Sequence, residues 1–261
     1  MSKKHSIDLT TGSVPKMLIR FTIPLIIANL LQQLYSAADS AVIGRYVGKT
    51  ALAAVGATGY ATGLILNLLI GLSIGASIIN ANLFGLKQTV ALRHNMHCSL
   101  VVALICGVLI SVVGIVMTPL IMTWTNCPKN VLDDAVFYMR IILSGAPGTM
   151  IYNFGAGILR THGDSKHPMY IMAFSGLLNV ILNLMFVVYF KMSVGGVALA
   201  TVISKYLSAF AVLIILFNPN GEYCLTFKEL RLYRKEAHQI IRVGLPCGLN
   251  SVAFSVSNTI V

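Results

Sequence analysis

Long runs without a charged side chain restrict how this chain can fold more than any other feature. Residues 21–38, 50–86, 94–128, 168–190 and 243–261 contain no Asp, Glu, Lys or Arg. A helix that crosses a bilayer needs about 20 mostly apolar residues. Because the hydrocarbon core holds no water, backbone N–H and C=O groups there must pair within the protein, and such runs therefore predict transmembrane helices.

Two further apolar runs are each interrupted by one cation. Residues 135–159 contain Arg140, and residues 194–217 contain Lys205, which brings the candidate spanning helices to seven. The composition agrees, because only 10% of the residues are charged, whereas a soluble domain carries roughly 25%. We therefore expect an all-α membrane protein, with a six-transmembrane-helix bundle followed by the start of a seventh helix.

The positive charges predict the orientation of the bundle, because Lys and Arg accumulate on cytoplasmic loops. With a cytoplasmic N-terminus, thirteen cations fall on inner segments: Lys3, Lys4, Lys16, Arg20, Lys87, Arg93, Arg160, Lys166, Lys228, Arg231, Arg234, Lys235 and Arg242. Four fall on outer segments: Arg45, Lys49, Lys129 and Lys191. This split predicts a multi-pass protein of the plasma membrane with its N-terminus inside. The net charge of +11 is then a topology signal, and we expect no nucleic-acid partner.

Asp39 is the one acidic residue that lies inside an apolar segment, since the other seven carboxylates lie in short polar stretches. An ionisable side chain in a bilayer is costly and therefore marks a candidate functional site. Gln32 and Ser36 share its helix face, and Tyr35 lies beside them. We interpret this face as the wall of a cavity for an ion or a substrate; the alternative is a polar stripe that holds helices together.

A second polar group lies on two later helices. Asn179 and Asn183 are four residues apart, and Thr201 lies one turn before Lys205 on the same helix face. All four are candidate ion or substrate ligands, with Na⁺ at Asp39 and Asn179 as one form of the site. For the asparagines the alternative is hydrogen bonding between helices. For Lys205 the choice is between a direct pair with Asp39 and an ammonium that reaches toward one membrane interface.

Signatures of catalysis are absent from the sequence. It contains no HExxH, no GxSxG and no Walker-type phosphate loop. The five cysteines are odd in number and form no CxxC pattern, so neither a disulfide framework nor a zinc site is indicated. We therefore expect no enzyme, no metal and no cofactor, and a transport activity that an H⁺ or Na⁺ gradient drives.

A short internal repeat predicts more helices than the chain contains. Residues 18–24 (LIRFTIP) align with residues 240–246 (IIRVGLP), with Arg and Pro retained. Repeated helix bundles are a common plan in transporters. On this basis residues 1–217 form the N-terminal six-helix bundle, residues 218–242 form a cytoplasmic linker between bundles, and residues 243–261 form the truncated start of a second bundle. The C-terminal six-helix bundle of the expected transporter would then be missing from this chain.

Several segments, which together cover nearly the whole chain, resemble the multidrug and toxic compound extrusion (MATE) transporters. Residues 23–24 (IP), 35–45 (YSAADSAVIGR) and 51–56 (ALAAVG) resemble the first helix of the family and its following loop. Residues 145–147 (GAP) and 157–166 (GILRTHGDSK) are similar to its fourth helix and inner loop. Residues 179–183 (NVILN) and 195–201 (GGVALAT) are similar to its fifth and sixth helices.

The resemblance implies a twelve-helix protein of two bundles that exports cationic or amphipathic compounds by alternating access in exchange for H⁺ or Na⁺. This sequence departs from the family pattern at Asn183, which is followed by Leu184, where the family commonly has Asp followed by Pro. Asp39 would then titrate without a second acid. The alternatives are a flippase for a lipid-linked sugar and a membrane scaffold or truncated half-transporter that carries nothing.

We predict that cysteines placed at Lys129 and Lys228 will report opposite sides of the membrane. In a background without the native cysteines, a membrane-impermeant maleimide added outside cells should label Lys129→Cys and should leave Lys228→Cys unlabelled until the membrane is opened. The reason is the thirteen-to-four distribution of cations. The reverse labelling pattern would show that the N-terminus lies outside.

Overall fold

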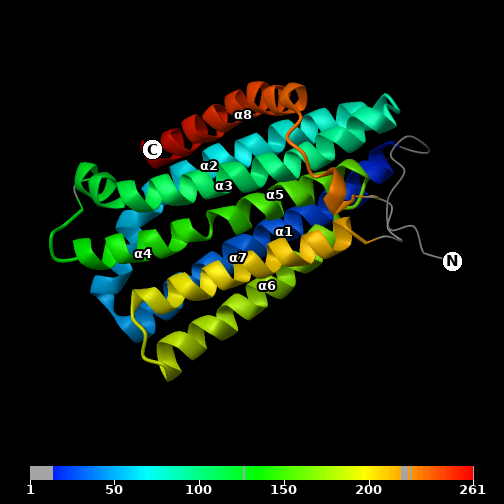
Figure 1. The fold of residues 1–261 in the computed structure, drawn as a ribbon. Helices are drawn as coiled ribbons and strands as arrows, with labels where there is room; N and C mark the ends of the chain where they lie inside the picture. The colour runs from blue at the N-terminus through cyan, green and yellow to red at the C-terminus, as the bar shows by residue number, and fades with distance from the viewer. Residues whose placement is uncertain (1–13, 126, 219–222, 224, 261) are drawn as a thin grey trace.

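The chain folds into an elongated bundle of α-helices that lie side by side (Figure 1). The computed structural model describes residues 14–125, 127–218, 223 and 225–260, and within them the chain forms eight α-helices and no β-strand. Lys3 and Lys4, two of the predicted inner cations, lie outside the described residues. The all-α fold expected from the apolar runs is confirmed.

The seven apolar runs form eight α-helices, because one run is divided into two helices. They are α1 (Val14–Val42), α2 (Lys49–Gly85), α3 (Thr89–Trp124), α4 (Leu132–Ser144), α5 (Ala146–Thr161), α6 (Lys166–Leu184), α7 (Val194–Leu216) and α8 (Arg234–Ile260). Short π-helical turns, Ile43–Val47 and Met185–Tyr189, continue α1 and α6. Among the described residues, five helices are long and apolar enough to cross a membrane: α1, α2, α3, α6 and α7.

The apolar run 135–159 forms two helices, where its length predicted one. The chain leaves α4 at Gly145, whose N–H donates to the Ile142 carbonyl oxygen at 3.0 Å, and α5 begins at Ala146. Pro147 lies in the first turn of α5, where its missing N–H removes no helical hydrogen bond. The proline therefore starts a new helix and does not kink an existing one.

α8 begins before the apolar run that predicted it. Its first residue is Arg234, so the last part of the segment 218–242, expected as a linker, is helical. The first turn holds three charged side chains, Arg234, Lys235 and Glu236. The hydrogen bonds of a helix do not require apolar side chains, so α8 can begin within this charged sequence. The uncharged run indicates only which part of the helix is suited to hydrocarbon.

α5 lies at the centre of the bundle, packed against α2, α3 and α7. Its side chains Met150, Phe154, Ile158 and Leu159 are at most 1% exposed. α6 packs against α1 and α7 on one side, and α8 packs against α2 on the other. Since lipid tails are as apolar as these side chains, the helices associate through close packing and polar contacts.

Glycines set the spacing between α2 and α8. A Cβ on Gly71 would overlap the backbone of Gly248, and a Cβ on Gly75 would overlap that of Gly244. Gly63 continues the same four-residue spacing on α2, but a Cβ there would meet nothing within 4 Å. Of the glycines with this spacing, Gly71 and Gly75 are thus the ones that bring α8 close.

The segment between α7 and α8 is attached to the end of the bundle where α1 begins (Figure 1). Tyr223 donates a hydrogen bond to Asp164 at 2.9 Å, and Arg93 pairs with Glu229 at 2.7 Å. The Thr226 N–H donates to Nε2 of buried His97 at 3.1 Å. These contacts hold the chain where it turns into α8.

We predict that Gly71→Ile separates α8 from α2 and that Gly63→Ile does not. The added side chain has no space against the Gly248 backbone, and overpacking of this kind costs about 1–3 kcal/mol. Thermal unfolding in detergent should therefore show a lower midpoint for Gly71→Ile alone. Equal midpoints for the two variants would contradict the close approach of α2 and α8.

Candidate functional site

The Asp39 carboxylate on α1 faces polar side chains of α6 and α7. Asn183 Nδ2 donates a hydrogen bond to Asp39 Oδ1, and Thr201 Oγ1 lies 3.2 Å from Asp39 Oδ2. Asp39 is half-buried, whereas Asn183 is fully buried and Thr201 is 6% exposed. The carboxylate thus receives donors from two neighbouring helices, as a charge in a bilayer requires.

Asn179 closes these contacts into a ring. Asn183 Nδ2 also donates to Asn179 Oδ1 at 3.1 Å, and Asn179 Nδ2 lies 3.3 Å from Thr201 Oγ1. The four-residue spacing places both asparagines on the same face of α6. We call Asp39, Asn179, Asn183 and Thr201 the Asp39 ring; sequence analysis predicted all four, and the fold brings them together from three helices.

The Asp39 ring has spare oxygen atoms. Asn183 Oδ1 is buried and accepts no hydrogen bond among the described residues. The single Thr201 hydroxyl proton has two acceptors, because Val197 O lies 3.0 Å from Oγ1 in addition to Asp39 Oδ2. Hard cations bind carboxylate, amide and hydroxyl oxygens. The ring residues therefore fit a small cation, and Asp39 can alternatively take a proton.

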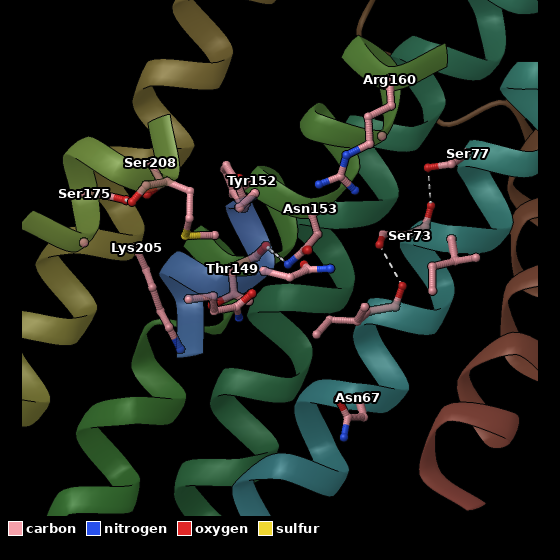
Figure 2. A pocket seen from close by; sticks show the side chains of 18 of the residues that line it. Asn67, Ser73, Ser77, Thr149, Tyr152, Asn153, Arg160, Ser175, Lys205 and Ser208 are labelled. Atoms are coloured by element: carbon pink, nitrogen blue, oxygen red, sulfur yellow. Dashed lines mark hydrogen bonds between the residues drawn. The ribbon is translucent and has the colours of Figure 1, made fainter. Parts of the chain in front are cut away.

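A cavity of about 830 Å³ lies beside the Asp39 ring and is lined by α1, α2, α5, α6 and α7 (Figure 2). Gln32, Tyr35 and Ser36 line it from α1, and Lys205 lines it from α7. The four ring residues are not part of this wall. The structure thus divides the sequence-predicted residues into an ion-type site, the ring, and a separate cavity.

Lys205 does not form the direct ion pair with Asp39 that one sequence hypothesis proposed. Among the described residues no ion pair joins the two side chains, and the partners of the two carboxylate oxygens of Asp39 are instead Asn183 and Thr201. Lys205 extends along the cavity wall (Figure 2). The two charges still interact electrostatically over a longer distance.

Sequence reasoning missed a polar stripe on α5. Thr149, Tyr152, Asn153 and Arg160 all line the cavity (Figure 2). Their spacing places them on one helix face, so the periodicity of polar residues over 149–160 was the signal that could have revealed them. Arg160 was counted only as a topology signal.

Comparison with known proteins places this architecture among membrane transporters. The family model described as MatE matches residues 24–185. The probable multidrug resistance protein YoeA of Bacillus subtilis (strain 168) is 28% identical over 253 residues, which cover 94% of this chain and 54% of YoeA. The chain therefore spans about half the length of this relative.

Two solved structures of one transporter type differ in how well they match. An outward-facing conformation of a multidrug resistance MATE family transporter of the MOP superfamily has a TM-score of 0.89 and 27% identity, covering 99% of this chain and 57% of that chain. An inward-facing conformation has a TM-score of 0.78 and 28% identity, covering 90% and 55%. The fold described above thus resembles the outward-facing conformation more closely.

We predict that Asn183→Leu destabilises the protein because it removes two donors at once. Asp39 Oδ1 and Asn179 Oδ1 would each lose the hydrogen bond from Asn183, and a buried polar group left without a partner costs about 1–3 kcal/mol. Thermal unfolding in detergent measures the loss.

The matched control is Asn29→Leu. Asn29 is exposed on the cavity side of α1 and makes no side-chain hydrogen bond within the described part of the chain. Its replacement should leave the unfolding midpoint nearly unchanged. Equal midpoints for both variants would show that the Asp39 ring does not contribute to stability.

Proposed function

The chain belongs to the MatE family, and from this premise we propose that it forms the ion-coupling half of a secondary transporter. The transporter exports amphipathic compounds across the plasma membrane in exchange for H⁺ or Na⁺. The observation that carries the proposal is the Asp39 ring, in which the carboxylate within the apolar part of α1 is held by amide and hydroxyl groups of α6 and α7.

Occupancy of the ring would change how three helices are held together. A proton on Asp39 converts one acceptor oxygen into a donor, so Asn183 Nδ2 or Thr201 Oγ1 loses its acceptor. Na⁺ instead would draw oxygens, including the spare Asn183 Oδ1, toward itself. Either ion alters the contacts among α1, α6 and α7, and a ligand that prefers one arrangement shifts the population toward it.

A single carboxylate limits the ring to a small charge change in each cycle. Asn183 stands where the family pattern commonly has a second acid, so one proton or one Na⁺ neutralises the site. One elementary charge that moves inward through 100 mV supplies about 2.3 kcal/mol. Export against a steep gradient would therefore also require a difference in ion concentration across the membrane.

Alternating access is the transport scheme that these observations support best. Relatives solved in outward-facing and in inward-facing conformations support a bundle that changes conformation during transport. The distribution of Lys and Arg favours a cytoplasmic N-terminus, so α5 would end at the inner side. Because Asp39 lies in the ring and outside the cavity wall, we assign it to the coupling ion; cationic substrates would depend on other groups.

We predict that Asp39→Asn abolishes ion-driven transport in the complete protein. Asn retains the size and much of the hydrogen bonding of Asp, but it cannot gain or lose a charge. Uptake of a fluorescent amphipathic dye into inverted membrane vesicles, driven by an imposed H⁺ or Na⁺ gradient, should fall at least tenfold. Expression and membrane insertion should remain near those of the wild type.

Asp133→Asn is the matched control. Asp133 is exposed in the first turn of α4, where the same substitution removes a carboxylate outside the Asp39 ring. Its transport should equal that of the wild type. If Asp39→Asn still moves the dye against a gradient, the coupling role of the Asp39 ring is wrong.

A further inference from the structure

The charged residues on the wall of the cavity are both cations. Of the described residues that line it, Arg160 and Lys205 carry a charge, and neither Asp nor Glu is present. The other polar lining groups are hydroxyls and amides, among them Ser73, Asn153 and Thr161. Since charges interact more strongly in a partly enclosed, low-dielectric space, this wall attracts anions and repels cations.

The two cations differ in how well they are compensated. Lys205 interacts electrostatically with Asp39. The Arg160 side chain forms no hydrogen bond or ion pair with any described residue, and its Nε is buried without an acceptor. A guanidinium group offers five N–H donors. Arg160 therefore presents an unused set of donors to the cavity.

Asp164 could have paired with Arg160, because it lies four residues later. Its carboxylate is instead bonded by other donors: Tyr223 Oη at 2.9 Å, His167 Nδ1, and the backbone N–H groups of residues 166 and 167 at 3.2 and 3.1 Å. Asp164 is 1% exposed, so these contacts keep it inside the protein. The acid nearest to Arg160 in sequence thus holds the segment after α7 and leaves the guanidinium free.

The Arg160 cation lies in the last turn of α5, where it also interacts favourably with the helix dipole. The interaction with the helix dipole does not depend on the cavity, and an Arg160 side chain directed away from the cavity would make it equally well. The Arg160 guanidinium instead points into the cavity, toward Asn153 (Figure 2). Its position therefore fits a group that enters the cavity.

We propose that Arg160 binds the anionic group of the transported compound. A planar guanidinium matches a carboxylate, sulfonate or phosphate, with which it can form two parallel hydrogen bonds. Ile70, Ile74 and Met172 line the same cavity and would contact an apolar body. The ligand class is thus an amphipathic organic anion. This inference rests on the proposed function, because it takes the cavity to be the substrate path.

Binding of two dyes that share a xanthene ring tests the proposal. Fluorescein is an anion at mildly alkaline pH, and tetramethylrhodamine methyl ester is a cation. We expect the complete protein, purified in an uncharged detergent, to bind fluorescein more tightly in fluorescence anisotropy titrations. Arg160→Gln should weaken fluorescein binding about tenfold, the effect of losing a hydrogen bond to a charged group, and should not weaken binding of the cationic dye.

Two further variants keep the result interpretable if Arg160→Gln is unstable. Arg160→Lys retains the charge and should recover part of the fluorescein affinity. Arg140→Gln makes the same substitution at an exposed residue of α4 that does not line the cavity, and it should bind fluorescein like the wild type. Preference for the cationic dye in the wild type, or equal fluorescein affinity in wild type and Arg160→Gln, would overturn the proposal.

Short-chain phosphatidylglycerol, added as a competitor, identifies the source of the anion. Displacement of fluorescein would assign the Arg160 site to a lipid head group, and no displacement would assign it to a soluble organic anion; both outcomes support anion binding. Asp39→Asn should lose ion-driven transport whether or not Arg160 binds the anion. Loss of coupling in Asp39→Asn together with an unaffected Arg160→Gln would therefore reject this inference alone and leave the proposed function standing.

Discussion

The lack of water in a bilayer is the constraint on which the rest of this structure depends. A polar group in hydrocarbon must find its partner within the protein, so the backbone of each apolar run is helical. The same rule acts on side chains. Asp39 lies in an apolar stretch of α1, and its carboxylate obtains donors from Asn183 of α6 and Thr201 of α7. One half-buried carboxylate thereby joins three helices through hydrogen bonds.

The ion-type site and the cavity are separate but share three helices, α1, α6 and α7. On α1, Ser36 lines the cavity about one turn before Asp39, and on α7, Lys205 lines it one turn after Thr201 of the Asp39 ring. A change in the hydrogen bonds of the ring would therefore move residues of the cavity wall directly. Such direct sharing of rigid helices offers a physical route for coupling between an ion and a substrate.

Much of the fold could be predicted because lipid imposes a simple requirement on composition. Four of the five membrane-length helices follow uncharged runs, and α7 follows the run that contains Lys205. The four-residue spacings placed Asn179 beside Asn183 and Gly71 beside Gly75 on single helix faces. The break at Gly145 was not predicted, since both halves of that run are equally apolar. Nor did the spacing of glycines indicate that α8 would pack on Gly71 and Gly75 and not on Gly63.

The sequence by itself determined that the chain is helical, that it lies in a membrane, and that Asp39 needs polar partners, because each follows from the cost of charge and unpaired backbone in hydrocarbon. Only the tertiary structure decided which partners those are. It paired Asp39 with Asn183 and Thr201, and it left Lys205 and Arg160 on the cavity wall without a carboxylate beside them. These outcomes depend on how helices distant in sequence pack, which no local spacing specifies.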